Sequence, residues 1–449
     1  MDSIETPTGY SKSMDSPNES VAPNDVPQLV DHLFRHQAGQ VVATLTRVLG
    51  AHNLQLAEDV VQETLIKALG QWSYHGVPNN PQAWLVRVAK NHAVDILRRE
   101  QRFSSAQAAD LELVDSASDV SIDLLENELY DDQLRMMFTC CHPALSREVQ
   151  VTLTLKTLGG FGVSEIAGAF LTNEATIAQR LVRARRTLRE SRLPFAVPEK
   201  HELSNRLAAV LDVLYLLFNE GYSAHRGEDL VRDELCAEAI RLTTLVAAHP
   251  IGDLPEVHAL LALMLLQAAR LPARRDALGD IVLLEEQDRT CWDQTLIIRG
   301  LLSLQRSATG SKLSAYHLQA GIAACHVSAP SFATTNWQRI LNQYDSLIAL
   351  NASPVIALNR AVAIAMLHGP DVGLAELERL ANEPSLRNYA LFHATCAALW
   401  QQSGDLERAA TWYRTARELS ENEPERRFLQ RKLDAMIHVD SPNSDSSFH

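Results

Sequence analysis

The sequence carries none of the short motifs that mark the common classes of enzyme. It has no GxxxxGK(S/T), no HExxH and no GxSxG, which are the signatures of phosphate-binding loops, zinc hydrolases and serine hydrolases. Its sixteen histidines are scattered along the chain, so no convergent group of catalytic side chains is evident. We therefore predict a protein that is not an enzyme and that holds neither a cofactor nor a metal.

Cysteine and long apolar runs are scarce as well. The six cysteines form no CxxC pair, and the one cluster is Cys140-Cys141-His142. Adjacent side chains rarely chelate a single metal, so we expect free thiols and a reducing compartment. The first 27 residues lack the basic start and apolar core of a signal peptide. No run of eighteen apolar residues predicts a membrane span, and these absences together favour a cytoplasmic protein without a membrane partner.

Positive charge is also in deficit. The 41 lysines and arginines face 55 acids, for a formal net charge of −14. A field of this sign repels nucleic acid, so any contact with DNA must come from a local basic patch. Such a patch lies in TNEATIAQRLVRARRTLRE (172–190), which carries five arginines. Basic residues also favour the last turns of any helix, so the surrounding sequence has to decide what the patch does.

The chain is rich in Leu and Ala and poor in β-branched runs, which favours an all-α fold. Between Phe103 and Leu134 there are nine acids and no Lys or Arg, a pattern typical of a flexible, solvated linker; helical patterning resumes near Asp131. The two prolines of LPFAVPEK (193–200) mark a second boundary. The predicted segments are a disordered N-terminus (1–27), a helical domain (28–102), an acidic linker (103–133), a second helical domain (134–192), a helical-repeat extension (201–438) and a disordered tail (439–449).

One helix of the first domain has a basic face. Asn80-Pro81 is a start signal, an N-cap followed by proline at the first helical position. An apolar stripe follows at helical spacing: Leu85, Val88, Ala89, Ala93 and Ile96. Arg87, Asn91, Arg98 and Arg102 fall on a different face of this helix.

The arginine patch belongs to a predicted pair of helices. Ser164 can cap a short first helix, the turn LTN follows, and Asn173 can cap the second helix. In the second helix Ile177, Leu181 and Ala184 form the buried face. The predicted outward residues are Thr176, Gln179, Arg180, Arg183 and Arg186. This is a helix-turn-helix layout, in which early residues suit base edges and later arginines suit phosphates.

A third motif is LQLAEDVVQETLIKAL (54–69). Leu54, Val61, Leu65 and Ala68 can pack inward. Asp59, Gln62 and Glu63 then share one exposed face through i, i+3 and i+4 spacing. A solvated acidic face is the commoner meaning of such a trio.

Near the C-terminus a repeat is visible. Small and aromatic residues follow the spacing of a tetratricopeptide hairpin: Ala397, Trp400, Gly404, Ala409, Tyr413 and Ala416. The preceding segment places Ala361, Ile364, Gly369 and Ala375 similarly. The C-terminal half is therefore predicted to be a helical-repeat domain.

Taken in order, these motifs resemble a bacterial sigma factor of the extracytoplasmic-function group over residues 29–192. The resemblance implies that AEDVVQETLIKAL, with Asp59, Gln62 and Glu63, grips the β′ clamp helices of core RNA polymerase, with the β flap as a second contact. It implies that PQAWLVRVAKNHAVDILRR melts and reads the −10 element of promoter DNA through Trp84, Arg87, Asn91 and Arg98. The residues it implies for the −35 element are Asn173, Glu174, Thr176, Gln179, Arg180, Arg183 and Arg186. Residues 28–102 would be sigma region 2, and 134–192 sigma region 4.

The remainder resembles the subgroup with a tetratricopeptide-like extension, through NEGYSA (219–224), LLEEQDR (283–289), PVIALNRAVAIA (354–365) and ERRFLQRKL (425–433). That subgroup often has an Asp-Gly-Gly-Ile-like turn, whereas this chain has Leu278-Gly279-Asp280-Ile281. We expect the extension either to bind a protein partner or to regulate in cis by docking on the sigma domains. In the free protein the acidic linker is expected to lie against the arginines of 180–192.

A second function class remains open at this point. A stand-alone helix-turn-helix regulator with a helical-repeat sensor would also carry the arginine patch. It would need neither the Asp59 face nor the Trp84 helix, and it would not co-purify with core polymerase.

Overall fold

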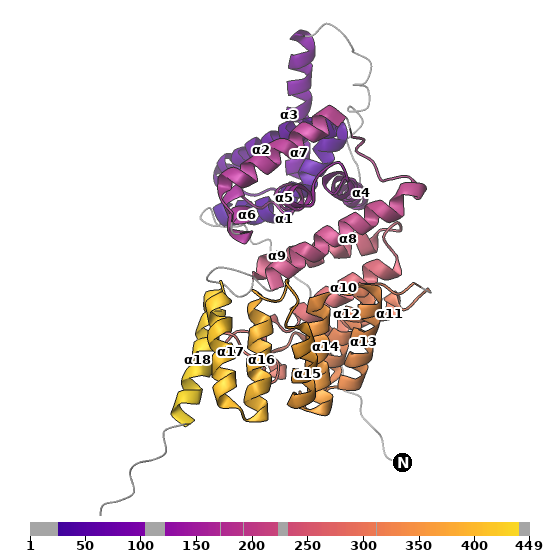
Figure 1. Ribbon diagram of the computed structural model, residues 1–449. Coiled ribbons are helices and arrows are strands. Elements are labelled where there is room, and N and C mark those ends of the chain that lie inside the picture. The colour runs from indigo at the N-terminus through magenta and orange to yellow at the C-terminus, as the bar shows by residue number, and fades with distance from the viewer. Residues whose placement is uncertain are drawn as a thin grey trace, which may run out of the picture. The chain divides into compact units, whose positions relative to one another are not determined.

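A computed structural model describes residues 26–103, 122–170, 172–191, 193–222, 232–310 and 312–439. Within these ranges the chain forms eighteen α-helices and no strand (Figure 1); Arg275 and Ile281 form an isolated bridge. The all-α prediction is confirmed. Residues 1–25 and 440–449 of the two predicted disordered ends, and 104–121 of the acidic linker, lie outside the described residues.

The chain divides into two compact units, Met1–Leu129 and Tyr130–His449. The first contains α1 (Val26–Leu49), α2 (Leu54–His75) and α3 (Pro81–Phe103), with a short 3₁₀ turn at Ala51–Asn53. Each of the three helices packs on the other two. The Asn80 side chain accepts a hydrogen bond of 2.9 Å from the backbone N–H of Ala83, so α3 begins where the sequence predicted.

Helix α4 (Ile122–Cys140) begins inside the predicted linker. Residues 122–133 are helical, although the acidic composition predicted a flexible segment with helix resuming only near Asp131. Negative charge is favourable near the N-terminus of a helix because of the helix dipole. An acidic stretch whose composition predicts a flexible linker can therefore still form the start of a helix.

The second unit continues with α5 (Arg147–Thr157), α6 (Val163–Ala169) and α7 (Glu174–Ser191). Helix α5 is buried along most of its length, including Val149, Leu153 and Leu155. It contacts α6, α7 and α8 (Lys200–Tyr222). The helix-turn-helix segment and the start of the extension therefore share a core around α5.

Beyond α8 the extension continues as α9 (Asp233–Ala248) and α10 (Pro255–Ala268). The segment Pro255–Ala273 is the one stretch among the described residues long and apolar enough to cross a membrane, but 78% of it is buried inside the fold. Its apolar character is accounted for by its place in the core of the extension, where α10 contacts α8, α9, α11 and α12.

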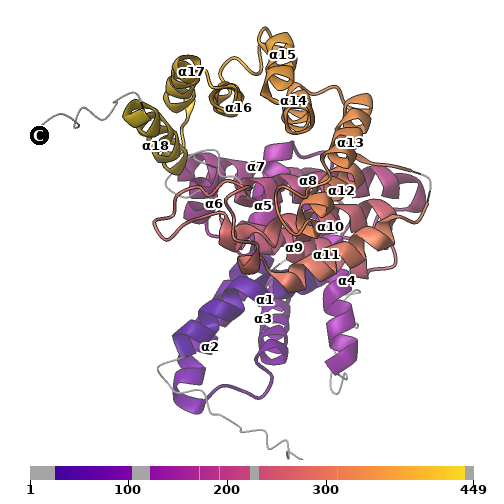
Figure 2. The ribbon, with the colours of Figure 1, turned by 90° about the horizontal axis from the view of Figure 1, so that it is seen from below.

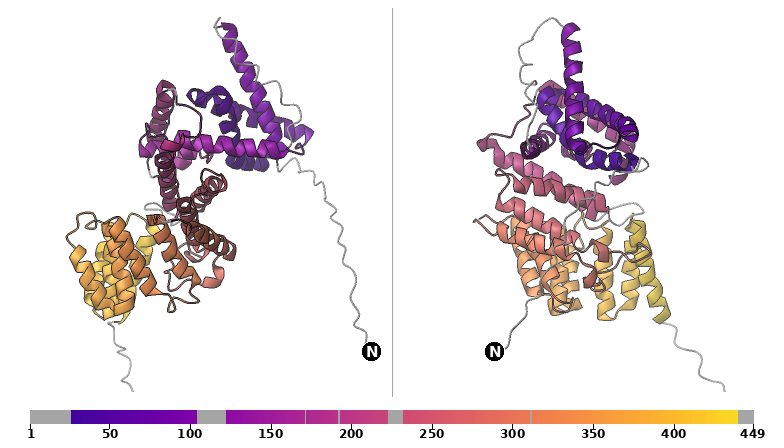
Figure 3. Two further views of the ribbon diagram at one scale, coloured as in Figure 1. Left: turned by 90° about the vertical axis from the view of Figure 1, so that its right-hand side faces the viewer. Right: turned by 180° about the vertical axis from the view of Figure 1, so that it is seen from behind.

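The rest of the extension is a succession of helices. They are α11 (Gln294–Ser307), α12 (Ala315–Ser328), α13 (Trp337–Leu350), α14 (Pro354–His368), α15 (Pro370–Leu380), α16 (Ala390–Ser403), α17 (Leu406–Leu419) and α18 (Glu423–Val439). Figure 2 shows α13 to α18 following one another along an arc, and Figure 1 shows α14 to α18 side by side. Figure 3 shows this orange-to-yellow part of the chain from two further sides. Each hairpin buries its apolar face on the next, as in a solenoid.

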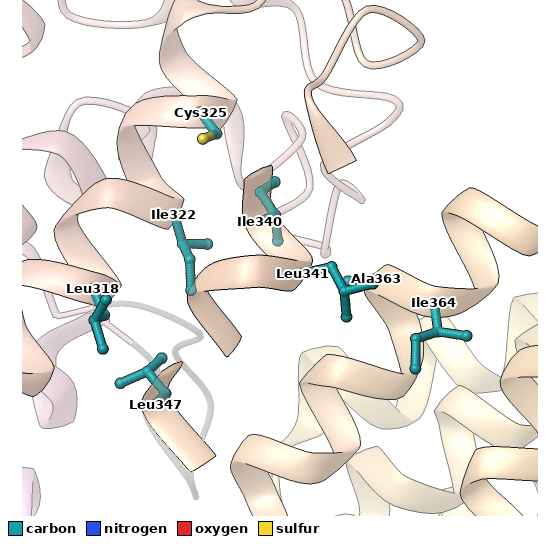
Figure 4. Close-up of a cluster of buried hydrophobic side chains, with 8 residues drawn as sticks. All are labelled: Leu318, Ile322, Cys325, Ile340, Leu341, Leu347, Ala363 and Ile364. Carbon is teal, nitrogen blue, oxygen red and sulfur yellow. The ribbon is translucent and has the colours of Figure 1, made fainter. Parts of the chain in front are cut away.

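Three successive clusters of buried side chains hold this array together. The first joins α12, α13 and α14 through residues such as Ile322, Ile340 and Ile364 (Figure 4). The second is built around Leu358 and Phe392, and the third around Tyr413. Because each cluster joins only neighbouring helices, the core of the array extends from one hairpin to the next.

The two predicted repeats correspond to the hairpins α14/α15 and α16/α17. Their turns contain Gly369 (φ 94°) and Gly404 (φ 90°), a backbone conformation that favours glycine. In the earlier hairpin, however, the small residue at the helix crossing is Gly373 and not Ala375, which is exposed. A Cβ on Gly373 would lie 2.5 Å from that of Ala365, so the close approach of α14 and α15 requires glycine there.

The turn at Leu278–Ile281, whose role the sequence left open, ties two distant parts of the extension together. The Asp276 carboxylate accepts hydrogen bonds of 2.9 Å from the N–H groups of Leu278 and Asp280. The buried carboxylate of Asp280 then pairs with Arg427, at 2.6 Å, and with Arg431, both on α18. Burial alone would raise the pKa of Asp280, but these two guanidinium groups hold it below its usual value.

Replacing Asp280 with asparagine should therefore destabilise the extension by about 1–3 kcal/mol at neutral pH, because it removes the charge that both arginines pair with. A carboxylate whose pKa is lower in the folded than in the unfolded protein stabilises the fold at pH values above its unfolded pKa. This contribution is lost as the pH falls through its folded pKa. The unfolding midpoints of wild type and Asp280→Asn should thus differ at pH 7 and converge in acid. A constant difference across this range would contradict the ion-pair explanation.

Candidate nucleic-acid interface

Helix α2 separates its faces as the sequence predicted. Leu54, Val61, Leu65 and Ala68 are buried. The other side exposes the three predicted contact residues Asp59, Gln62 and Glu63. The structure adds Ile66, which is 67% exposed and lies one turn further along. Ile66 stands at i+4 from Gln62 and at i+3 from Glu63, so it shares the exposed face with them.

Glu63 also faces the neighbouring helix. Its carboxylate lies 3.3 Å from Nε2 of His92 on α3, and His92 Nδ1 lies 3.5 Å from Nζ of Lys67. This polar group connects the exposed face of α2 with α3 inside the same unit.

Helix α3 presents the four residues predicted for the −10 element on one side. Arg87, Asn91 and Arg98 are exposed, whereas Leu85, Ala89 and Ala93 of the apolar stripe are buried. Trp84 is half-buried and meets the buried Trp72 edge-on, with ring centroids 5.3 Å apart and planes at 64°. This T-shaped contact fixes the Trp84 ring against Trp72, and the Trp84 side chain is not fully buried.

The helix-turn-helix segment is formed by α6 and α7. Asn173 caps α7: its side-chain oxygen accepts bonds of 2.7 Å and 2.9 Å from the N–H and hydroxyl of Thr176. The cap of α6 differs from the prediction. Helix α6 begins at Val163, and the side chain of Glu165 accepts a 2.6 Å bond from the N–H of Gly162, so Ser164 lies inside the helix and does not cap it.

Helix α7 buries Ile177, Leu181, Ala184 and Leu188. The predicted contact residues lie on the other side: Asn173, Glu174, Gln179, Arg183 and Arg186 are exposed, and Thr176 and Arg180 are half-exposed. Arg186 donates a 2.7 Å bond from Nε to Glu190, which raises the pKa of the guanidinium. One of the arginines is therefore partly neutralised by its own helix.

Helices α4 and α5, which precede the helix-turn-helix segment, are bound to the extension through residues that sequence reasoning missed. Arg147 on α5 donates 2.7 Å and 3.1 Å bonds to the Asp212 carboxylate and the Ala209 carbonyl of α8. Asp212 accepts a further bond, of 3.0 Å, from the Tyr316 hydroxyl. Arg206 donates a 2.7 Å bond to the carbonyl of Phe138. None of these pairs is close in sequence, so no local pattern indicates them.

The cysteine cluster lies in this part of the fold. Cys140 and Cys141 are buried and unbridged. Burial raises the pKa of Cys141 to about 12, so it stays a protonated thiol at neutral pH. Within the described residues, no group of three or more His, Cys, Asp or Glu is placed to hold a metal ion.

Comparison with known families is consistent with this geometry. Residues 33–103 match the family described as Sigma-70 region 2, and 135–188 match Sigma-70, region 4. Residues 206–308 match a family of unknown function. A relative from Rhizobium meliloti (strain 1021), "Uncharacterized protein R00370", is 39% identical over 85% of this chain and 90% of its own length.

Two further relatives are shorter. "ECF RNA polymerase sigma factor SigK" of Mycobacterium ulcerans (strain Agy99) is 29% identical over 35% of this chain and 81% of its own length. "ECF RNA polymerase sigma-E factor" of Haemophilus influenzae is 28% identical over 34% of this chain and 82% of its own.

The matches to Sigma-70 region 2 and to Sigma-70, region 4 identify a transcription initiation factor of the sigma-70 type. More particularly, the chain belongs to the extracytoplasmic-function sigma factors and carries a C-terminal helical extension. Membership of this family implies core RNA polymerase and promoter DNA as partners.

Proposed function

We propose that this protein directs core RNA polymerase to promoters by contacting their −10 and −35 elements. The observation that carries the proposal is the division of α2, α3 and α7 into a buried apolar face and an exposed polar face. All of the predicted contact residues lie at least partly on the exposed side. A stand-alone regulator would require only α7, whereas here α2 and α3 are equally organised.

In this proposal α2 binds the β′ clamp helices through Asp59, Gln62 and Glu63, and the region 4 segment meets the β flap. The protein acts in the cytoplasm without catalysing a reaction of its own. Residues 28–102 and 134–192 act as the two sigma domains, joined by the acidic linker, and residues 201–438 act as the extension.

We further propose that the extension regulates initiation in cis by holding the helix-turn-helix segment. Two observations support this: the bonds from Arg147 to Asp212 and from Arg206 to the Phe138 carbonyl, and the burial of α5 between α7 and α8. On α7, Arg183, Arg186 and Arg189 are exposed. The proposed role of the extension is therefore to position α7 and not to cover its arginines. The expected docking of the acidic linker on these arginines concerns residues 104–121, outside the described part of the chain.

The test is transcription in vitro with purified core polymerase. Adding the full-length protein should produce promoter-specific transcripts that core polymerase alone does not make. A protein that binds the same promoter duplex alone but never changes the start sites of core polymerase would instead be a conventional regulator.

Trp84→Ala should separate binding from opening within that assay. Stacking of an unstacked base on an aromatic ring contributes about 1–3 kcal/mol, so the variant should bind core normally yet open the −10 region less. Permanganate reactivity of thymines reports the opening. Trp84→Phe is the matched control and should retain most of it, since it keeps an aromatic face beside Trp72. Equal opening by wild type and Trp84→Ala would exclude a stacking role.

In α7, Arg180 and Arg186 should behave differently. Arg180→Ala should reduce the free energy of promoter binding by about 1–3 kcal/mol and relax the sequence specificity at one position of the −35 element. Arg186→Ala should weaken binding to all promoters alike. It should also reduce, by about one, the slope of the logarithm of the binding constant against the logarithm of salt concentration. Glu190→Gln releases Arg186 from its own helix and should strengthen DNA binding modestly. Uniform loss on every promoter for both arginine variants would make Arg180 a phosphate contact only.

A further inference from the structure

A cavity of about 550 Å³ opens between α15, α16 and α17 in the extension. Its walls are partly acidic and partly aromatic. The residues that matter here are Asp371, Glu378, Phe392, Trp400, Arg408 and Trp412. The volume falls within the range of ordinary ligand-binding sites.

The acidic wall has no cation of its own. Asp371 and Glu378 stand two turns apart on α15, and both are exposed. Among the described residues neither carboxylate has an ion-pair partner, whereas the neighbouring Glu376 pairs with Arg360 and Arg379. Glu378 lies in the last turn of α15, where the helix dipole disfavours negative charge. The position of Glu378 is therefore not explained by a contribution to the stability of α15.

The aromatic wall shows how a cation is held. The Arg408 guanidinium lies 4.5 Å from the centroid of Trp400, and its Nε is 3.3 Å from Asp405. Trp412 stands nearby, with its ring centroid 6.1 Å from that of Phe392. Aromatic faces beside carboxylates favour a guanidinium or an ammonium group, because the ring quadrupole and the negative charge attract the same cation.

The spacing of the acids fits two cations on one extended segment. At a rise of about 1.5 Å per residue, Asp371 and Glu378 are separated by about 10 Å along α15. In a polyproline II segment, residues i and i+3 face the same side about 9 Å apart. The protein's own ends are poor candidates, since residues 1–25 contain five acids and one lysine, and 440–449 contain two acids and no Lys or Arg.

We propose that this cavity binds an extended segment of a partner protein that carries Arg or Lys at positions i and i+3. Asp371 and Glu378 each pair with one of the two cations, and Trp412 and Phe392 pack against the stem of the segment. The site does not depend on the proposed promoter contacts, and its test contains neither polymerase nor DNA.

Calorimetric titration of the full-length protein can test the proposal with four acetylated, amidated probes. They are the peptides Arg-Pro-Pro-Arg, Arg-Arg-Pro-Pro and Glu-Pro-Pro-Glu, together with arginine amide. Arg-Pro-Pro-Arg should bind at least fivefold more tightly than Arg-Arg-Pro-Pro, which has the same charge at the wrong spacing. The glutamate peptide should not bind. Equal affinity for the two arginine peptides, or for arginine amide alone, would overturn the assignment of a spaced segment.

Paired variants make the result local. Asp371→Asn/Glu378→Gln should weaken binding of Arg-Pro-Pro-Arg at least tenfold. Glu407→Gln/Glu418→Gln removes the same charge from exposed positions on α17 that do not line the cavity, and should change binding less than twofold. Since all four are exposed carboxylates, unchanged melting temperatures confirm that the variants are folded. Equal weakening by the two pairs would show attraction to net charge only and would overturn the site.

Discussion

Replacing Asp59 and Glu63 together with arginine should abolish most of the binding to core RNA polymerase. Both carboxylates are exposed on one face of α2, and the proposed partner surface is basic. Placing like charge against it costs several kcal/mol; a loss of about 3 kcal/mol corresponds to roughly 100-fold in affinity. Pull-down with purified core polymerase, followed by titration in a labelled binding assay, measures this loss directly.

The control has to match the change of charge. Glu407→Arg/Glu418→Arg makes the same substitutions at exposed positions on α17, and should leave core binding within about twofold. Glu63 lies 3.3 Å from His92, so the melting temperature of the first variant should be checked as well. Core binding at the wild-type level in a folded Asp59→Arg/Glu63→Arg protein would remove α2 from the polymerase interface.

Local signals in the sequence predicted the helix starts and faces well. Asn80 and Asn173 were expected to cap α3 and α7, and both accept the hydrogen bonds that define a cap. Capping and helical periodicity involve residues within a turn or two of each other, so the sequence contains the whole of the interaction. The same reasoning explains why the buried faces of α2 and α7 were predictable.

Long-range contacts were not predictable in this way. Asp280 pairs with arginines about 150 positions further along the chain, and no local spacing connects them. Ser164 was misplaced because the stronger signal came from Glu165, whose side chain reaches back to Gly162. The sequence pattern placed Ala375 at the helix crossing, where the structure has Gly373. The cause is similar, since only the approach of α14 to α15 shows which small residue lies at the crossing.

The boundary between the helix-turn-helix segment and the extension stays a prediction. The prolines of 193–200 predicted a division there, and the helices on both sides of it belong to the compact unit Tyr130–His449. The division remains a proposal about function, because α5 is buried between α7 and α8. The structure thus makes the extension part of the body that carries α7.

Ending the chain at Lys200 should therefore lower promoter-specific transcription at least tenfold. The truncation removes α8 and so uncovers the side of α5 that packs on it. It also removes the residues of α8 that bond to Arg147 and to the carbonyl of Phe138. Exposing buried apolar side chains costs about 1.5–3 kcal/mol each, and domains of this size have little stability to spare. Circular dichroism should show lost helix and a lower melting temperature, while binding to core through α2 should persist.

A less disruptive variant distinguishes a missing regulator from an unfolded domain. Asp212→Ala in the full-length chain breaks the bonds from Arg147 and Tyr316 but leaves α8 in place. It should reduce −35-dependent transcription severalfold with only a small change in melting temperature. Pairing it with Arg147→Ala in a double-mutant cycle should give a coupling of about 1 kcal/mol, since the two residues are in direct contact. Full activity of both the truncated chain and Asp212→Ala would mean that the extension neither supports nor regulates the region 4 segment, and that the contact between α5 and α8 has no consequence for initiation.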